Sequence, residues 1–179
     1  MTEVQLDIHK DLIEACKRGN TRAQFKLYQL YSKAMYNICM RMMNTREDAE
    51  DMLQDSFTEA FRKLDSFRYE ATFGAWLKRI VVNRCINELR RRNSEFITIN
   101  NIEIYETDDD IFEDTDLDVH RIRQALERLP DGYRVIFSLY FLEGYDHQEI
   151  SQIMGISEST SKTQLFRAKL KLKEILTQS

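Results

Sequence analysis

Residues 146–176 decide the fold of this chain, and they read DHQEISQIMGISESTSKTQLFRAKLKLKEIL. The segment from Asp146 to Met154 places aliphatic side chains at the spacing of a short amphipathic helix. Gly155-Ile156-Ser157 then indicates a short turn that contains a glycine. A longer helix continues to about Leu176. Two helices joined by so short a glycine turn predict a helix-turn-helix.

The last of these helices has two different sides on a wheel of about 100° per residue. Its inner side is apolar, at Leu165, Ala168, Leu172 and Ile175. Its outer side carries donors, cations and an aromatic ring, at Ser159, Lys162, Thr163, Phe166 and Arg167. Such side chains can contact phosphates and base edges in a major groove. The alternative is a plain helical hairpin with a solvated face. Ser161 departs from the pattern, because an apolar residue is commoner on the inner side.

The whole composition favours helices and two small domains. Of 179 residues, 42% are hydrophobic, only one is proline and five are glycine. The net charge of −4 is unevenly distributed, because residues 95–118 hold ten acids and no lysine or arginine. The rest of the chain has 26 basic and 20 acidic residues, or +6. We therefore predict an all-α protein with domains at 1–94 and 119–179 and an acidic linker at 95–118. A long loop inside one domain is the alternative.

Several functional classes are excluded by what the sequence lacks. Cys16, Cys39 and Cys85 form no Cys-x-x-Cys pair, and the three histidines have no zinc-ligand spacing. We expect buried reduced thiols, no metal and no cofactor. No phosphate loop or nucleophile motif occurs, so we expect no catalytic residues and no enzyme. The N-terminus has no signal-peptide pattern and no apolar run can span a bilayer, which predicts a cytoplasmic protein without a membrane span.

The first predicted domain contains at least three helical segments. Residues 12–43 indicate helices broken near Gly19-Asn20, with Phe25 the first of a series of apolar residues at helical spacing. Asn44-Thr45 predicts the start of another helix, whose apolar stripe runs from Ala49 to Leu64. The outer side of this helix is acidic and amide-bearing, at Asp48, Asp51, Gln54, Asp55 and Glu59. Such a face is either simply solvated or a docking surface for a basic partner.

A further helix, from about Thr72 to Arg92, carries a second candidate nucleic-acid surface. One side is apolar, at Leu77, Ile80, Val81 and Cys85. Another aligns an aromatic ring, cations and amides, at Trp76, Arg79, Asn83, Asn87 and Arg90. Rings and guanidinium planes stack on unpaired bases, and amides read base edges. The alternative is that Trp76 belongs to the core and the arginines are solvated. The second domain opens with a helix over 119–129, stopped by Pro130, and a helix over 133–142.

Taken together, these segments resemble the small two-domain RNA polymerase sigma factors of the extracytoplasmic-function type, in the sigma-70 family. The resemblance covers the chain from about Ala23 to Leu176. Residues 48–57, DAEDMLQDSF, are similar to the family segment that docks on the clamp helices of the largest polymerase subunit. The resemblance thus implies polymerase contacts at Asp48, Asp51, Gln54 and Asp55.

Two further motifs extend the resemblance to DNA. Trp76-Leu77-x-x-Ile80, with Asn83 and Arg90-Arg91, is similar to the helix that melts and reads the minus-ten element. This implies contacts at Trp76, Arg79, Asn83, Asn87, Arg90 and Arg91, with Asn83 at the position that helps hold a flipped-out base. The end of the chain is similar to the family's minus-thirty-five reader, which implies contacts at Ser159, Thr160, Lys162, Thr163, Phe166, Arg167 and Lys169.

The resemblance implies a protein that binds core RNA polymerase, recognises promoter DNA and starts transcription. The DNA is expected to be double-stranded upstream and single-stranded at the melted element. An anti-sigma protein stays open as a further partner, and no fused regulatory domain is expected after Ser179. Two rival functions remain at this stage. One is a stand-alone helix-turn-helix regulator, which leaves the first domain's acidic face unexplained. The other is an interaction module that sequesters a protein partner.

Overall fold

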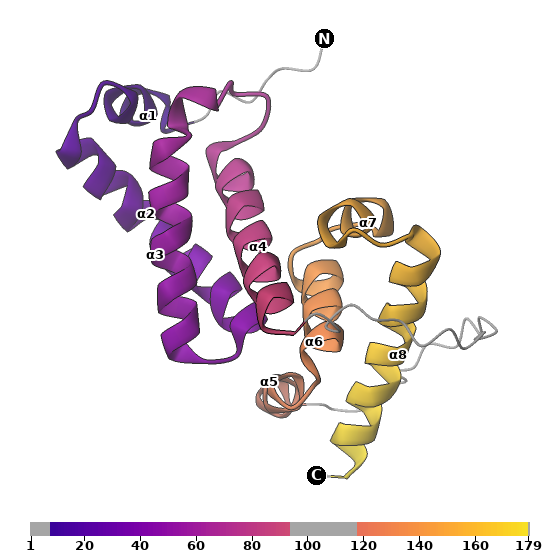
Figure 1. Ribbon diagram of the computed structural model, residues 1–179. Helices are drawn as coiled ribbons and strands as arrows, with labels where there is room; N and C mark the ends of the chain where they lie inside the picture. Colours follow the sequence, from indigo (N-terminus) through magenta and orange to yellow (C-terminus); the bar gives the residue numbers. More distant parts are fainter. Residues whose placement is uncertain (1–7, 94–117, 179) are drawn as a thin grey trace. The chain divides into compact units, whose positions relative to one another are not determined.

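A computed structural model describes residues 8–93 and 118–178, and every regular element in these two ranges is helical. The chain divides into two compact units, residues 1–88 and 89–179. Figure 1 shows the elements in chain order. The prediction of an all-α protein is confirmed. The predicted acidic linker, 95–118, lies outside the described residues apart from Asp118, so its ends stay predictions.

The first unit consists of α1 (Lys10–Lys17), α2 (Thr21–Met43), α3 (Arg46–Arg62), a 3-10 turn η1 (Leu64–Ser66) and most of α4 (Phe73–Arg92). Local sequence sets the helix ends. The Asn20 side chain accepts from the Ala23 amide and begins α2, and Thr45 accepts from Asp48 N at 3.3 Å to begin α3. Asn44 ends α2 in the left-handed conformation, at φ 64°. The predicted helix start at Asn44-Thr45 is confirmed.

Side chains of α1, α2, α3 and α4 form the core of this unit. Leu27, Ala49, Phe57 and Leu77 are among its fully or almost fully buried members. The Tyr31 and Phe73 rings pack edge-on, with centroids 5.1 Å apart. Gly74 permits this approach, because a β-carbon there would lie 3.2 Å from Tyr31 Cε1.

The three cysteines of the chain belong to this core. Cys16, Cys39 and Cys85 are free thiols, all buried. Their predicted role as core residues is therefore confirmed. Burial also raises the pKa of the Cys16 thiol above its ordinary value, which disfavours the reactive thiolate.

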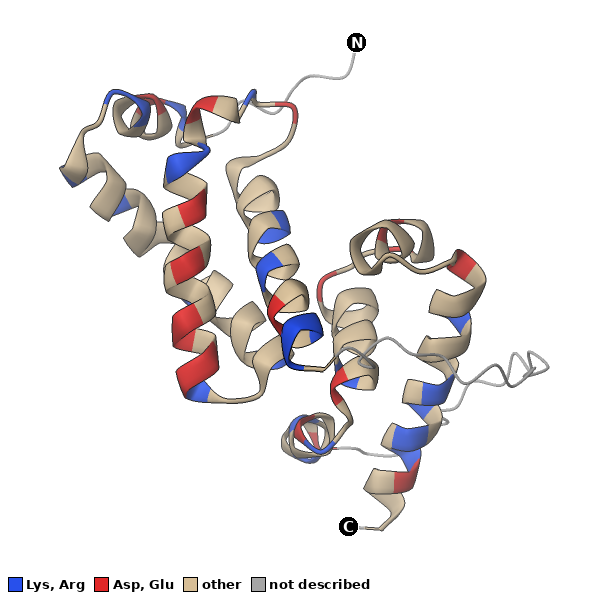
Figure 2. Ribbon diagram, viewed as in Figure 1, with Lys and Arg blue, Asp and Glu red and all other residues tan. Residues whose placement is uncertain are grey.

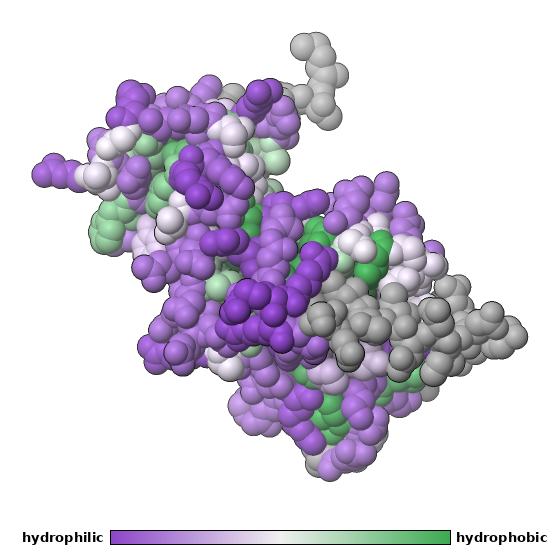
Figure 3. Space-filling model, in the orientation of Figure 1, coloured by the Kyte–Doolittle hydropathy of each residue, from purple (hydrophilic) through white to green (hydrophobic). Residues whose placement is uncertain are grey.

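Phe25 differs from the expected apolar series along α2. It has the right spacing along the sequence, but its side chain is 63% exposed. The buried residues nearby are Ala23 and Leu27, each two positions away and therefore on nearly the opposite side of the helix. A few other large hydrophobic residues are exposed as well, among them Leu30 and Leu170. The face drawn in Figure 3 is mostly hydrophilic, with hydrophobic residues in small separate areas.

The second unit consists of α5 (Val119–Glu127), α6 (Asp131–Phe137), a π-helical turn η2 (Ser138–Leu142), α7 (His147–Met154) and α8 (Glu158–Thr177). Helix α8 packs against α5, α6 and α7. The predicted 119–129 helix ends at Glu127, and Pro130 precedes the first turn of α6, where its missing N–H is not needed. The predicted 133–142 helix therefore begins earlier, at Asp131, and widens into η2. Leu139, Ile150, Leu165 and Ala168 are core residues of this unit.

Candidate nucleic-acid and protein-binding surfaces

Helices α7 and α8 form the predicted helix-turn-helix. Asp146 and Glu149 make a reciprocal capping box at the start of α7, which satisfies amides that the first turn leaves unpaired. Gly155 ends α7 in the left-handed conformation, at φ 66°, and Ser157 accepts from Thr160 N to begin α8. These are the turn residues that the sequence singled out. They fix where α8 begins and therefore which of its residues face outward.

A hydrogen bond joins the two helices behind this turn. Ser161, on α8, is fully buried, and its Oγ lies 2.8 Å from Nδ1 of His147 on α7. The His147 ring also stacks on Tyr140, with centroids 4.8 Å apart. Ser161 thus keeps the inward position that the sequence predicted. A polar partner replaces the apolar contact that is commoner there.

The predicted DNA-contacting residues share the outer side of α8. Ser159 and Lys162 are exposed, whereas the others are partly exposed: Thr160, Thr163, Phe166, Arg167 and Lys169. The Lys169 ammonium lies 5.4 Å from the centroid of the Phe141 ring. Figure 2 shows the row of basic residues along α8. The fully buried Ala168 and the buried Leu165 and Leu172 face the core, so the predicted two-sided character of α8 is confirmed.

The predicted acidic side of α3 faces solvent. Asp51, Gln54 and Asp55 are exposed, and Asp48 is half-buried. The Asp48 carboxylate accepts a 2.7 Å hydrogen bond from the Thr45 hydroxyl. The acidic residues of α3 are coloured red along the ribbon in Figure 2.

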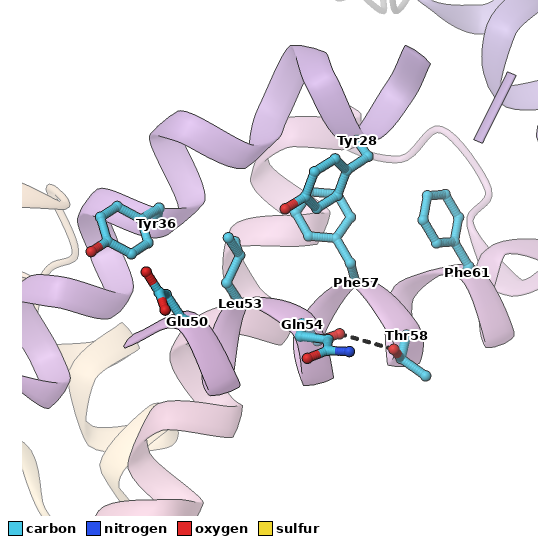
Figure 4. Close-up of a pocket in the computed structure, with 8 residues that line it drawn as sticks. All are labelled: Tyr28, Tyr36, Glu50, Leu53, Gln54, Phe57, Thr58 and Phe61. Atoms are coloured by element: carbon cyan, nitrogen blue, oxygen red, sulfur yellow. Dashed lines mark hydrogen bonds between the residues drawn. The ribbon is translucent and has the colours of Figure 1, made fainter. Parts of the chain in front are cut away.

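An apolar groove runs between α2 and α3 beside this acidic row. Its volume is about 640 Å³. Leu53 and Phe57 form much of its floor, and the tyrosines of α2 stand across from them (Figure 4). Its full lining is Tyr28, Tyr36, Glu50, Leu53, Gln54, Phe57, Thr58 and Phe61. Gln54 belongs to both the groove and the acidic row, so the two surfaces are continuous.

The candidate strand-binding side of α4 is partly exposed. Asn83, Asn87 and Arg91 are exposed, whereas Arg79 and Arg90 are half-buried. Trp76 is half-buried too, and its ring lies 5.2 Å from Phe67 and 5.6 Å from Phe73 between centroids. The indole is thus anchored in an aromatic cluster while part of it remains accessible. Both readings of Trp76, as a core residue and as a stacking surface, are compatible with this position.

Comparison with known families identifies both units. Residues 27–95 match the family model described as sigma-70 region 2, and residues 120–172 match sigma-70, region 4. The ECF RNA polymerase sigma factor SigM of Mycobacterium tuberculosis is 32% identical over 167 residues, which cover 93% of this chain and 83% of that protein. This chain belongs to the ECF RNA polymerase sigma factors. It binds core RNA polymerase and directs promoter recognition and transcription initiation.

Other relatives align with this sigma factor along most of its length. ECF sigma factor SigW of Bacillus subtilis is 28% identical and covers 93% of this chain and 96% of its own. The structure of the sigma factor RpoE in complex with the anti-sigma factor NepR, from Bartonella quintana, aligns with a TM-score of 0.58 at 25% identity. It covers 85% of this chain and 95% of RpoE. CnrH, solved with the cytosolic domain of CnrY, shares the fold with a TM-score of 0.56 at 24% identity, covering 94% of this chain and 96% of its own.

Two features of this sigma factor were not foreseen from its sequence. Arg84 lies between the candidate strand-binding side of α4 and its buried side, and it forms ion pairs with Asp55 and Glu59 of α3. His147 holds Ser161 across the helix-turn-helix. A basic residue at the edge of an apolar helix face is a weak sign of such a bridge. Ser161 at an inward position was the stronger sign, since a buried hydroxyl needs a partner.

Over residues 8–93 and 118–178, no group of three or more histidine, cysteine, aspartate or glutamate side chains could hold a metal ion. Within those same residues, none of the helices combines the length and the apolarity that crossing a membrane requires.

Proposed function

We propose that this sigma factor assigns one task to each of three helices: α3 binds core polymerase, α4 holds the melted strand and α8 reads the upstream duplex. The observation that carries this proposal is that the candidate residues for each task gather on one helix. On α3 and α8 they also lie opposite a buried apolar side. A helix with this division can present a rigid set of contacts without losing its core packing.

The proposed polymerase-binding surface joins the acidic row to the apolar groove. Asp51 and Asp55 would attract a basic helix, and Asp48 adds charge at the start of α3. Charges alone give little net affinity in exposed positions, so an apolar anchor is needed. The groove beside Gln54 supplies a place for one bulky side chain of the polymerase. Electrostatic attraction and apolar burial would then act on the same partner helix.

The proposed strand-binding surface lies along α4. Flipping a base out of a duplex costs a few kcal/mol, and stacking on a protein side chain returns about 1–3 kcal/mol per base. The exposed part of Trp76 offers such a surface, and Asn83 and Asn87 offer donors and acceptors to base edges. Arg79, Arg90 and Arg91 would hold phosphates. The aromatic cluster around Trp76 keeps the ring in place, which reduces the entropy lost on binding.

The proposed upstream reader is the first half of α8. Ser159, Thr160, Lys162 and Thr163 come first, so they would enter the major groove near the helix N-terminus. Phe166 offers contact to a thymine methyl, and Arg167 and Lys169 offer bidentate or phosphate contacts. We retain 1–94, 95–118 and 119–179 as the proposed domain division. Two sites on one chain would bind jointly through their effective concentration.

The proposed role requires no chemistry from the sigma factor itself. We infer that it is not an enzyme and acts in the cytoplasm, with RNA synthesis left to the polymerase. A regulatory partner fits this proposal as well. The related RpoE was solved in complex with an anti-sigma factor, which supports an anti-sigma protein as a partner of this chain.

Charge reversal on α3 tests the assignment of the polymerase-binding surface. The variant D51K/D55K should weaken binding to core polymerase at least tenfold, which corresponds to about 1.4 kcal/mol. Asp65→Lys is the matched control, because Asp65 is an exposed acid in η1, away from the row. Binding is measured by titrating labelled sigma factor with core enzyme. Equal affinities for the two variants would contradict the assignment.

A further inference from the structure

Arg84 on α4 lies between two carboxylates of α3. Its Nη2 is 3.4 Å from Asp55 Oδ2, and its Nε is 3.2 Å from Glu59 Oε2. Figure 2 shows the acidic residues of α3 in red and the basic residues of α4 in blue. The bridge connects a residue of the proposed polymerase-binding row, Asp55, to the helix proposed to capture the strand.

The two halves of this bridge differ in how firmly they are held. The Glu59 side chain is only 16% exposed and is also bound by Lys63 at 2.5 Å, whereas the Asp55 side chain is 53% exposed. The hydrogen bond and charge of Lys63, with the charges of Arg84 and Arg62, keep the pKa of Glu59 below its ordinary value. Exposed ion pairs contribute little, so a partner's cation can replace Arg84 at Asp55. Glu59 would keep its hold on Arg84.

Arg84 also lies beside the strand-binding residues along the helix. Asn83 precedes it, and Asn87 is one helical turn away, a spacing that brings side chains together. The Arg84 side chain is 40% exposed overall, but its Nε is buried beside Glu59. The outer nitrogens of the guanidinium can therefore reorient in solvent while Nε stays in place. A small rotation away from Asp55 would therefore bring a positive charge toward a strand lying over these two asparagines.

We propose that Arg84 couples polymerase docking to strand capture. In the free protein, Asp55 holds the guanidinium on the α3 side. When a basic side chain of the polymerase pairs with Asp55, Arg84 pivots on Glu59 and binds a phosphate of the single strand. This inference rests on the proposed function, since it assumes that α3 meets the polymerase and α4 the strand. By linkage, the strand must also strengthen polymerase binding by the same factor.

The linkage gives the first measurement. Affinity of the labelled chain for core polymerase is measured with and without the non-template strand of a promoter selected by the reconstituted holoenzyme. The strand should tighten binding about fivefold or more in the native chain, in the usual range for coupled sites. Arg84→Met should bring this ratio close to one. The control, Arg68→Met, removes an equal charge from the exposed loop before α4 and should preserve the ratio.

A second measurement uses the free chain and a fluorescent single-stranded oligonucleotide at low salt. Asp55→Asn and Asp51→Asn remove the same charge from the same row, but only Asp55 lies beside Arg84. Asp55→Asn should raise DNA affinity about threefold more than Asp51→Asn, and the excess should vanish in an Arg84→Met background. Circular dichroism establishes that each variant is folded, and Arg84→Lys, which keeps the charge, provides a second substitution expected to retain part of the ratio.

The outcomes separate this inference from the proposed function. A chain that never binds core polymerase overturns the proposed function. If it binds, but the strand leaves its affinity unchanged or Arg84→Met keeps the native ratio, only the coupling is overturned. An equal gain from Asp55→Asn and Asp51→Asn also overturns the coupling, because general electrostatics would then explain both.

Discussion

His147 Nδ1 and Ser161 Oγ lie 2.8 Å apart and join the two helices of the helix-turn-helix. Ser161 is fully buried, so this contact satisfies a hydroxyl that water cannot reach. The imidazole is fixed in turn by stacking on Tyr140. The pair therefore sets how α8 packs on α7, and with it the outward direction of Lys162 and its neighbours.

Removing the hydroxyl should loosen α8. Ser161→Ala leaves an imidazole nitrogen without its partner, and we expect a loss of about 1–2 kcal/mol in the stability of the second unit. Hydrogen exchange of the α8 amides measures this loss without assuming two-state unfolding of the whole chain. Ser151→Ala is the control, since the Ser151 hydroxyl donates to the Gln148 carbonyl of its own helix at 2.7 Å and does not join the two helices. An equal effect of both substitutions would contradict the role of the pair.

Acid should destabilise the second unit through His147. Burial and the charge of Lys162 lower the pKa of His147 below its ordinary 6.5, Lys169 adds to this, and Asp146 and Glu158 oppose it. The unfolded chain therefore binds the proton more readily. The stability that the second unit gains from neutral His147 is fully present above pH 6.5. It is lost as the pH falls from 6.5 through the lowered pKa of His147 in the folded protein. His147→Gln should flatten this part of the pH–stability curve. A curve unchanged by the substitution would refute the assignment.

The turn of the helix-turn-helix should tolerate few substitutions at Gly155. Its φ of 66° is strained for residues with a β-carbon, so Gly155→Ala should cost about 1 kcal/mol. Gly155→Asn should cost less, because asparagine tolerates the left-handed region. Thermal unfolding of the two variants compares them directly. Equal melting temperatures for the native chain and Gly155→Ala would argue against strain at this position.

Phosphate contact by α8 should be visible in salt dependence. Lys162→Ala should weaken holoenzyme binding to duplex promoter DNA and reduce the slope of log K against log salt by about one. Lys173→Ala provides the control, because Lys173 is an exposed lysine near the far end of the same helix. Filter binding or anisotropy across a salt series gives both slopes. We expect a smaller slope for Lys162→Ala than for Lys173→Ala. Identical slopes for the two variants would show that Lys162 does not contact a phosphate.

Short-range patterns predicted most of the fold, because caps and helical spacing are local. Gly155, Ser157 and Thr45 end or begin helices as their residue types indicate. The spacing of apolar residues did not predict which ones would be covered, so the exposure of Phe25 was missed. Whether an apolar side chain is buried depends on neighbouring helices that are distant in the sequence.

The candidate site was less predictable where it depends on contacts between helices. The Arg84–Asp55 pair joins residues on two helices, and no spacing rule relates them. The groove beside Gln54 likewise requires α2 and α3 to be placed together. By contrast, the outer residues of α8 share one helix, so the wheel predicted their grouping. The resemblance to a family supplied the tasks of α3 and α4, which residue chemistry alone left open.

Promoter-directed transcription tests the central claim most directly. Core RNA polymerase is supplied with this chain and a library of genomic DNA fragments, and the 5′ ends of the transcripts are mapped. We expect discrete start sites that require the chain, and a strong loss of these transcripts with K162A/R167A. Core enzyme alone should give none of them. If the chain binds core enzyme and no fragment yields a defined start site, its assignment as a promoter-directing sigma factor is contradicted.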